Sequence, residues 1–325
     1  MQSMTDEAIL NAWHSMRSEA DMQPLTNAAV CRSESDWLIG LNSTRALTIL
    51  QSRGGFSVTP AGRVQTPTLA ILTQRELEIQ AFEPEPYSEV WADFGVQSGV
   101  YSGRWIDRDW KKNDNPHSRA ERIWDSALAT VIRDRCRGKS GTVTEEKKPV
   151  TTIAPLLYDL TSLQREAANR YGFSAKRTLQ LAQECYEKHK VLTYPRTDSR
   201  YLPEDYLGKV YGIVGAVAEE NAEFAPFARD ILDNKRVKPN RRVFDTKKVS
   251  DHFAIIPTGK IEKLSGDVQK LFEMVMARFL AVFFPPAVFE DTRRTTLIDH
   301  RDGVTDAFLT TGRVLVEPGW QAVYG

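Results

Sequence analysis

One short stretch in the middle of the chain combines residue types that suit phosphoryl transfer, namely Tyr194, Pro195 and Arg196. Proline disfavours the α conformation for the residue before it, so this stretch predicts an extended strand that presents Tyr194. Alternate residues of an extended strand share one side, which places Tyr194 and Arg196 together. A phenol can attack phosphorus while a guanidinium binds the non-bridging oxygens and stabilises the charge that develops. The stretch therefore predicts a tyrosine nucleophile beside an arginine that holds phosphate.

Two further requirements and one competing interpretation accompany this hypothesis. A free tyrosine has a pKa of about 10, so the phenol needs a nearby cation or base to act at neutral pH. Thr197 and Ser199 are expected to donate additional hydrogen bonds to the phosphate. The competing interpretation is a half-buried tyrosine in a turn, with a surface ion pair between Arg196 and Asp198. Tyr-Pro-Arg by itself is too short a motif to decide between the two.

Longer stretches around this motif decide in favour of chemistry. The segment LTYPRTDSRYLP, Leu192–Pro203, resembles the active-site segment of type IA DNA topoisomerases, in the form typical of topoisomerase III. Three other segments resemble elements of the same family and follow in the family's order. They are DWLIGLNSTRALT at Asp36–Thr48, GRVQTPT at Gly62–Thr68 and SDHFAIIPT at Ser250–Thr258. The resemblance covers essentially the whole chain, with Phe253 standing where the family usually has a second histidine.

The resemblance implies roles for particular residues. Tyr194 would form a 5′-phosphotyrosine link with a cut single strand of DNA, and strand rejoining would need no ATP. Arg196 would hold the scissile phosphate, and His252 would contact that phosphate or position a neighbouring group. Without the family, a lone histidine before an apolar run indicates a structural residue. The candidate DNA-binding residues are Arg45, Arg63, Gln65, Lys190, Thr197 and Ser199. For Arg45, Arg63 and Gln65 the competing interpretation is helix capping and surface charge.

The resemblance also implies a Mg²⁺ cofactor, held in the family by a glutamate and a D-x-D-x-E cluster of a Toprim domain. The most similar string here is Asp107–Lys111, which ends in lysine and is expected to form a surface turn. We therefore expect no metal ligands in this chain, and we expect it to be truncated at both ends. Without divalent charge at the phosphate, the reacting oxygens lose a major stabilisation. The isolated chain is expected to bind single-stranded DNA without relaxing supercoils, and a Toprim-bearing chain is the candidate partner in trans.

Two alternatives to a topoisomerase remain at this level. A non-catalytic single-stranded DNA-binding module that keeps the same scaffold would also lack a metal site. A tyrosine recombinase uses several Arg and His residues around a tyrosine near the C-terminus, whereas Tyr194 lies in mid-chain. Replacing Tyr194 by Phe discriminates between an enzyme and a binding module, because only the enzyme loses cleavage.

Composition sets broad bounds on the class of protein. The 325 residues carry no net charge, but the charge is unevenly distributed. Positions 1–40 hold six acidic and two basic residues, whereas positions 161–200 hold eight basic and four acidic, and positions 231–250 seven and two. A basic middle of the chain suits a phosphate-binding channel. Three dispersed cysteines without a CxxC pair indicate a reducing compartment, and no apolar run is long enough for a membrane span. We expect a cytoplasmic, nucleoid-associated protein that has no membrane partner.

The pattern of elements predicts an α+β multidomain protein, which the resemblance extends to the toroid-like fold of type IA topoisomerases. Residues 1–80 are expected to be a helical domain, with a helix at about Pro67–Ile79 that has Thr66 as N-cap and Leu69, Leu72 and Ile79 facing inward. Residues 81–150 and 259–325 are expected to form one discontinuous β-rich arch, with a helix at 116–135. Residues 151–258 are expected to form an inserted helical domain that carries Tyr194. Ser174 is expected to cap one helix, and Pro285-Pro286 to end a later one that spans about Ser265–Phe284.

Overall fold

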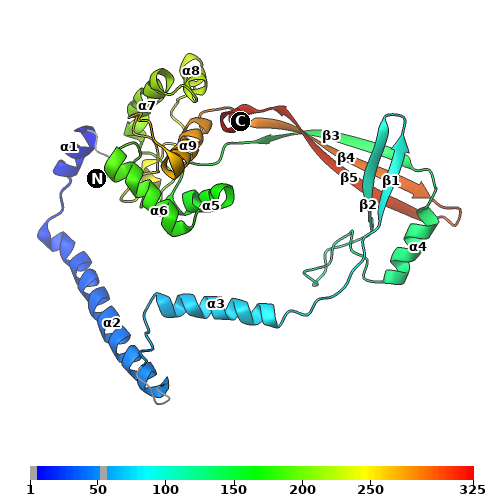
Figure 1. The fold of residues 1–325 in the computed structure, drawn as a ribbon, viewed down its shortest axis with the longest axis horizontal. Coiled ribbons are helices and arrows are strands. Elements are labelled where there is room, and N and C mark those ends of the chain that lie inside the picture. Colours follow the sequence, from blue (N-terminus) through cyan, green and yellow to red (C-terminus); the bar gives the residue numbers. More distant parts are fainter. Residues whose placement is uncertain (1–5, 52–56) are drawn as a thin grey trace. The chain divides into compact units, whose positions relative to one another are not determined.

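The computed structural model describes residues 6–51 and 57–325. It divides into two compact units (Figure 1). One unit is Ser15–Tyr87, and the other joins the residues up to His14 to Ser88–Gly325. Each unit is considered by itself below.

The smaller unit is built from two helices, α2 (Glu19–Gln51) and α3 (Gln65–Gln80). The chain between them is held to α2 by side chains, because the Thr44 hydroxyl accepts a hydrogen bond from the backbone N–H of Ala61 at 3.0 Å. The hydroxyl of Thr48 accepts one from Thr59 in the same way. Serine and threonine hydroxyls commonly supply backbone partners of this kind in loops.

Helix α3 departs from its sequence prediction in two respects. It begins at Gln65, and Thr66 is not its N-cap, since the Thr66 hydroxyl accepts instead from the N–H of Gly62. The expected inward residues Leu69, Leu72 and Ile79 are 63%, 62% and 55% exposed. No described side chain of α2 or α3 is buried. The prediction of an inward apolar face was therefore wrong for the described chain, because amphipathic spacing shows that a face is apolar but not that anything covers it.

The larger unit contains one antiparallel sheet whose strands come from both sides of a long helical segment. The strand order is β1-β2-β5-β4-β3. Strand β3 pairs along its whole length with β4, and β4 and β5 form a hairpin. Helix α4 is shorter than the helix expected at 116–135, since the chain up to Asp125 is turns and Asp125 caps it. Asp107–Asp109 is an exposed turn, as expected. The bounds are β1 Trp91–Val96, β2 Gly99–Ile106, α4 Ser126–Cys136, β3 Thr142–Thr152, β4 Ala287–Asp299 and β5 Thr305–Glu317.

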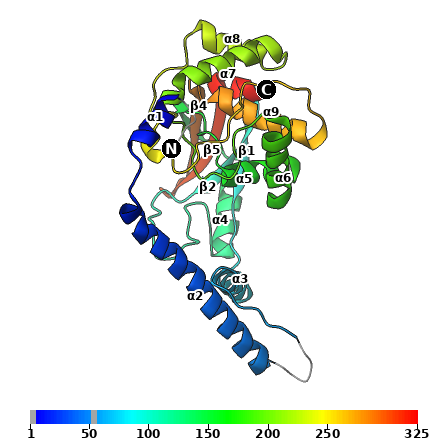
Figure 2. The same ribbon diagram turned by 90° about the vertical axis from the view of Figure 1, so that its left-hand side faces the viewer.

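Helices between β3 and β4 enclose the main hydrophobic core. Ser174 caps α6 by accepting from the N–H of Arg177, as the sequence predicts. Helix α9 contributes ten buried residues and packs against α6, so this core extends to Phe283, well past the boundary expected at residue 259 (Figures 1 and 2). Pro285-Pro286 then separates α9 from β4. The elements are α5 Leu160–Tyr171, α6 Ala175–Glu184, a π-helical turn Cys185–His189, α7 Leu207–Glu220, α8 Ala225–Asp233 and α9 Gly266–Ala281.

Three short 3₁₀ turns complete this unit, at Glu204–Tyr206, Thr246–Lys248 and Gly319–Tyr324. A separate helix, α1 (Asp6–His14), lies at its N-terminal end. In the described part of the chain, no helix is both long enough and apolar enough to cross a membrane. Helices and a single antiparallel sheet together confirm the α+β class.

Candidate active site

The Tyr194 segment is held in an extended conformation by a second segment about sixty residues further along the chain. The N–H of Thr193 donates to the carbonyl of Ile256 at 3.0 Å, and the N–H of Thr258 donates to the carbonyl of Val191 at 3.0 Å. The Thr193 hydroxyl adds a bond by accepting from the N–H of Ile256 at 2.9 Å. The segments LTYPRTDS and SDHFAIIPT, which only a resemblance connected in the sequence, are thus directly paired.

The chain enters this segment through an abrupt end to α6. The helix widens into the π-helical turn Cys185–His189, and Lys190 follows in the left-handed conformation with φ 61°. The N–H of Val191 closes the turn on the carbonyl of Cys185 at 2.9 Å. Single π turns inside helices occur frequently at functional sites. Pro195 then disfavours the helical conformation at Tyr194, and the chain bends at Pro195.

Burial alternates along the strand as its period of two requires. Pro195, Thr197 and Ser199 are buried, whereas Tyr194 is half-buried and Arg196 is exposed. Tyr194 and Arg196 therefore share the solvent-facing side, which agrees with the spacing argument.

The Tyr194 ring lies in a short row of aromatic groups. Its centroid is 4.4 Å from the imidazole of His252, at an interplanar angle of 44°. On its other side the ring of Tyr186 meets it edge to face at 5.4 Å and 77°. The Nζ of Lys190 lies 5.5 Å from the centroid of Tyr186, close enough for a cation–π contact. The row fixes the plane of the Tyr194 ring, while its hydroxyl makes no hydrogen bond to another described residue.

Arg196 is an exposed guanidinium that has no ion-pair partner among residues 6–51 and 57–325. The ion pair with Asp198 that the competing interpretation required is not formed, because Asp198 accepts from the Ser250 hydroxyl at 2.7 Å. An unpaired guanidinium beside a phenol is free to bind an anion from solution. Its five donors match the oxygens of a phosphate.

Thr197 and Ser199 do not present their hydroxyl protons to solvent. Thr197 donates to the carbonyl of His252 at 2.9 Å, and Ser199 donates to the carbonyl of Lys248 at 3.0 Å. A hydroxyl has one proton, so neither residue has one left for a phosphate in this conformation. In this structure both residues fasten the Tyr194 segment to the segment that carries His252, and phosphate contacts from them stay a prediction.

The far end of the strand is anchored on α5. The carbonyl of Thr197 accepts from the N–H of Leu160, and the Nε of Arg200 lies 3.0 Å from an Asp159 carboxyl oxygen. Asp159 also caps α5 by accepting from the N–H of Ser162. Burial opposes ionisation of Asp159, but the hydrogen bonds from Ser162 and Arg200 outweigh it and lower the pKa of the carboxyl.

Phe253 stands where the resembling family usually has a second histidine, and it is used for packing. Its ring lies 4.7 Å from that of Tyr206, against the main hydrophobic core. The position therefore carries no polar contact here, while His252 keeps its place at Tyr194.

The other candidate DNA-binding residues belong to the smaller unit. Arg63 lies 3.4 Å from the Asp36 carboxylate and donates to the carbonyl of Arg32 at 3.3 Å. Arg45 is exposed on α2, and Gln65 is the first residue of α3. The contact between Arg63 and Asp36 joins the segments Asp36–Thr48 and Gly62–Thr68, which the sequence left apart.

The residues at Tyr194 do not fit a Mg²⁺ site. Magnesium prefers a set of oxygen ligands, usually carboxylates. Within the described ranges, three or more potential ligands converge at one place only, Cys136, His300 and Asp306. A thiol and an imidazole do not suit Mg²⁺, so no catalytic step is assigned to that ion here.

Sequence reasoning missed Tyr186 and the positioning role of Thr197 and Ser199. Tyr186 lies in the π-helical turn Cys185–His189 that directly follows α6. Its ring meets that of Tyr194 from this turn, which the sequence did not predict.

The helical segment between β3 and β4 therefore carries a half-buried Tyr194 together with an exposed Arg196 and an exposed His252. A sequence profile of the DNA topoisomerase family matches residues 20–325, so the chain belongs to that family. Within it, the chain is of the type IA, topoisomerase III-like kind.

Similar proteins support this assignment. The chain is 38% identical to DNA topoisomerase 3 of Bacillus subtilis over 330 residues, a match that covers all of this chain and 42% of the relative. It is 36% identical to DNA topoisomerase 3 of Bacillus licheniformis with the same coverage. The solved structure of topoisomerase I from Thermotoga maritima shares the fold, with a TM-score of 0.65 at 23% identity over all of this chain and 49% of that one. The chain thus spans less than half the length of these relatives.

Proposed function

We propose that this chain supplies the tyrosine nucleophile of an ATP-independent DNA topoisomerase that cuts and rejoins one strand through a 5′-phosphotyrosine intermediate. The observation that carries the proposal is the solvent-facing pair Tyr194 and Arg196, with the His252 ring 4.4 Å from the Tyr194 ring. These three residues are the proposed catalytic group.

The chemistry follows from what each group can do. The hydroxyl oxygen of Tyr194 attacks the scissile phosphorus, a tyrosine–phosphate bond forms, and the bond to the 3′ oxygen breaks. The phenol proton passes to solvent, and the 3′ oxygen takes up a proton from solvent and leaves as a hydroxyl. Arg196 binds the non-bridging oxygens, and its charge stabilises the transition state. Because the phosphotyrosine keeps the energy of the phosphodiester, the released 3′ hydroxyl can reverse the reaction without ATP.

His252 has a positioning role in this proposal, with a phosphate contact from its exposed side. The Thr197 hydroxyl fixes its backbone carbonyl, so ring and backbone are held relative to Tyr194. In-line displacement at phosphorus depends mainly on such positioning and on charge neutralisation.

The proposed substrate is single-stranded DNA, because a strand must be unpaired to reach Tyr194. Lys190 on the larger unit and Arg45, Arg63 and Gln65 on the smaller unit are the proposed DNA-binding residues. Aromatic rings near basic residues bind single strands by stacking on the bases. We propose that half-buried Tyr186 stacks on a base in this way, in addition to its contact with Tyr194. A nucleoid-associated, cytoplasmic location goes with this substrate.

The family's Mg²⁺ would have to be bound by residues outside the described site, since no group of three or more potential ligands converges on Tyr194 in the described ranges. We propose that the isolated chain binds single-stranded DNA, does not relax supercoils, and acts with a Toprim-bearing chain in trans. The same observation favours the second candidate, a non-catalytic single-stranded DNA-binding module.

The test is a covalent-adduct assay with a labelled single-stranded oligonucleotide and Mg²⁺, with and without a Toprim-bearing chain from a topoisomerase III relative. We expect an adduct on a denaturing gel only in the mixture. It should vanish with Tyr194→Phe and persist with Tyr201→Phe, a matched change on the same strand.

Each other outcome corrects a specific part of the proposal. An adduct that survives Tyr194→Phe would exclude Tyr194 as nucleophile. An adduct formed by the chain alone would remove the need for a partner. Binding without any adduct in the mixture would favour the non-catalytic module.

A further inference from the structure

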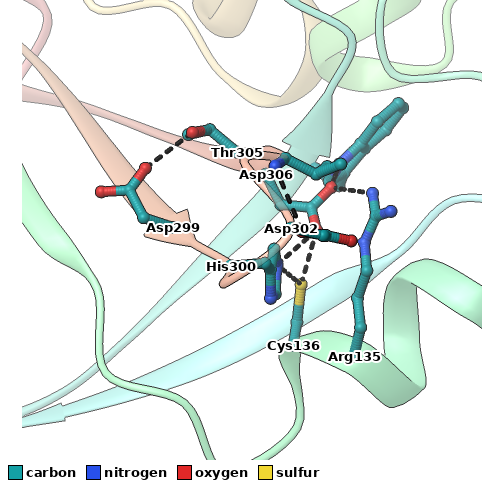
Figure 3. A network of polar contacts seen from close by, with 9 residues as sticks. Arg135, Cys136, Asp299, His300, Asp302, Thr305 and Asp306 are labelled. Atoms are coloured by element: carbon teal, nitrogen blue, oxygen red, sulfur yellow. Dashed lines mark hydrogen bonds and ion pairs between the residues drawn. The ribbon is translucent and has the colours of Figure 1, made fainter.

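Three side chains with metal-binding atoms converge at one end of the sheet, in a place that the proposed function does not use (Figure 3). Cys136 is the last residue of α4, His300 lies in the turn between β4 and β5, and Asp306 is the second residue of β5. They border the small core cluster that contains Ile132 and Phe308, which is separate from the main hydrophobic core around the Tyr194 strand.

The three ligand atoms lie close to the spacing of a tetrahedral zinc site. Cys136 Sγ is 3.9 Å from His300 Nε2 and 3.1 Å from Asp306 Oδ2, and His300 Nε2 is 2.9 Å from the same oxygen. Zinc bonds of about 2.0–2.3 Å at tetrahedral angles separate such ligand atoms by about 3.3–3.6 Å. Each observed distance is within about half an ångström of that range, so small side-chain shifts suffice to admit an ion.

We propose that Cys136, His300 and Asp306 bind one Zn²⁺ ion, with a water molecule as the fourth ligand. The ion would join α4 to the β4–β5 turn and so brace the far end of the sheet. This site is independent of the phosphoryl-transfer chemistry at Tyr194.

A shell of partners already orients the carboxylate. Arg135 donates to both oxygens of Asp306, from Nε and from Nη2, each at 2.6 Å. The indole N–H of Trp105 donates to Oδ1 at 2.9 Å. Outer contacts of this kind fix metal ligands in position and are a usual part of metal sites.

The charges and protons balance in both states. Without metal, the Arg135 guanidinium offsets the Asp306 carboxylate, which accepts from the Nε2–H of His300 and from the Cys136 thiol. On binding, the thiol proton passes to solvent and the sulfur–zinc bond forms. The Nε2 of His300 gives up its proton to solvent and bonds to zinc, and the ring carries its remaining proton on Nδ1, taken from solvent if that nitrogen was bare. Zn²⁺ with one thiolate and one carboxylate is neutral, which leaves the charge of Arg135 on a side chain that is 27% exposed.

The chemistry of the ligands selects the ion. A thiolate and an imidazole favour Zn²⁺ and its spectroscopic substitute Co²⁺, whereas Mg²⁺ requires oxygen ligands. The site is therefore distinct in kind from any magnesium site of the proposed enzyme. Three protein ligands and a water also predict an exchangeable ion rather than a closed structural centre.

The test is a Co²⁺ titration of the complete 325-residue chain followed by optical absorption, with Zn²⁺ and Mg²⁺ as competitors. We expect one ion per chain, a thiolate-to-cobalt charge-transfer band, displacement by Zn²⁺ and no displacement by Mg²⁺. Cys136→Ser should remove the band and weaken binding at least tenfold, while Cys185→Ser and Cys31→Ser should leave both unchanged.

A measurement on the unaltered chain keeps the test independent of folding in the variants. Zn²⁺ in slight excess should raise the midpoint of thermal unfolding, since an ion that binds the folded state stabilises it. Absence of a bound ion in the unaltered chain, or an unchanged cobalt band in Cys136→Ser, would overturn the proposal. The cluster would then be a hydrogen-bonded clasp only.

Discussion

The hydroxyl of Thr197 is the most informative single group at the site, because two roles for it make opposite predictions. In the structure it donates to the carbonyl of His252 at 2.9 Å and accepts from the N–H of Ser199 at 3.1 Å. Thr197→Val keeps the shape of the side chain and removes both bonds. Thr197→Ser keeps the hydroxyl and removes only a methyl group.

The expected magnitude follows from the two backbone groups that lose their partner. A buried donor or acceptor that loses its hydrogen bond costs about 1–3 kcal/mol, and Ser199 is buried. We expect Thr197→Val to lower the free energy of unfolding by about 2–4 kcal/mol. Thr197→Ser should cost about 1 kcal/mol, the contribution of one buried methyl group.

The assay is urea unfolding of both variants followed by circular dichroism, together with single-stranded DNA binding by fluorescence anisotropy. We expect Thr197→Val to lose stability, and to bind DNA with unchanged affinity at temperatures where it remains folded. If instead Val leaves stability within about 0.5 kcal/mol of the Ser variant and weakens DNA binding, the hydroxyl contacts phosphate and the positioning argument is wrong.

Three further predictions concern charge, pH and the exposed helix. Arg196→Lys should lower adduct formation in the complemented assay by about 10²–10³-fold, as loss of a preorganised donor does, while Arg200→Lys should lower it much less. Asp159 has a lowered pKa in the folded state, so its stabilising effect is present above the unfolded carboxyl pKa of about 4 and is lost as pH falls below it. Asp159→Asn should reduce the loss of unfolding free energy as the pH falls below about 4. An unchanged pH dependence in this variant would show that other groups cause the loss. Leu72→Gln on α3 should change stability of the chain by less than about 0.5 kcal/mol, since the side chain is exposed; a loss above 2 kcal/mol would show that the face is covered.

Elements with strong local signals could be predicted from the sequence. Ser174 and Pro285-Pro286 mark helix ends through a single capping hydroxyl and a missing N–H, which act within one turn of the chain. The alternating strands before and after the helical segment follow from side-chain period alone. The extended strand at Tyr194 follows from Pro195 in the same way.

Other features depended on which surfaces meet. The apolar residues of α3 have the spacing that is typical of a buried helix, yet nothing in the described chain covers Leu69, Leu72 or Ile79. The domain boundary at residue 259 stays a prediction, and the structure adds that α9, which follows it, packs into the helical core. The spacing of apolar residues shows which face of a helix is apolar. Whether another element covers that face depends on how the rest of the chain packs.

By itself the sequence determined that a tyrosine and an arginine share one side of an extended strand, because proline and the period of a strand act over neighbouring residues. It also identified the family, because four segments match in order. Only the tertiary structure decided that His252 lies against Tyr194, that Tyr186 completes the aromatic row, and that the Thr197 proton belongs to a backbone carbonyl. These are contacts between residues up to sixty positions apart, and their geometry depends on how separate segments pack, which local conformational preferences do not specify.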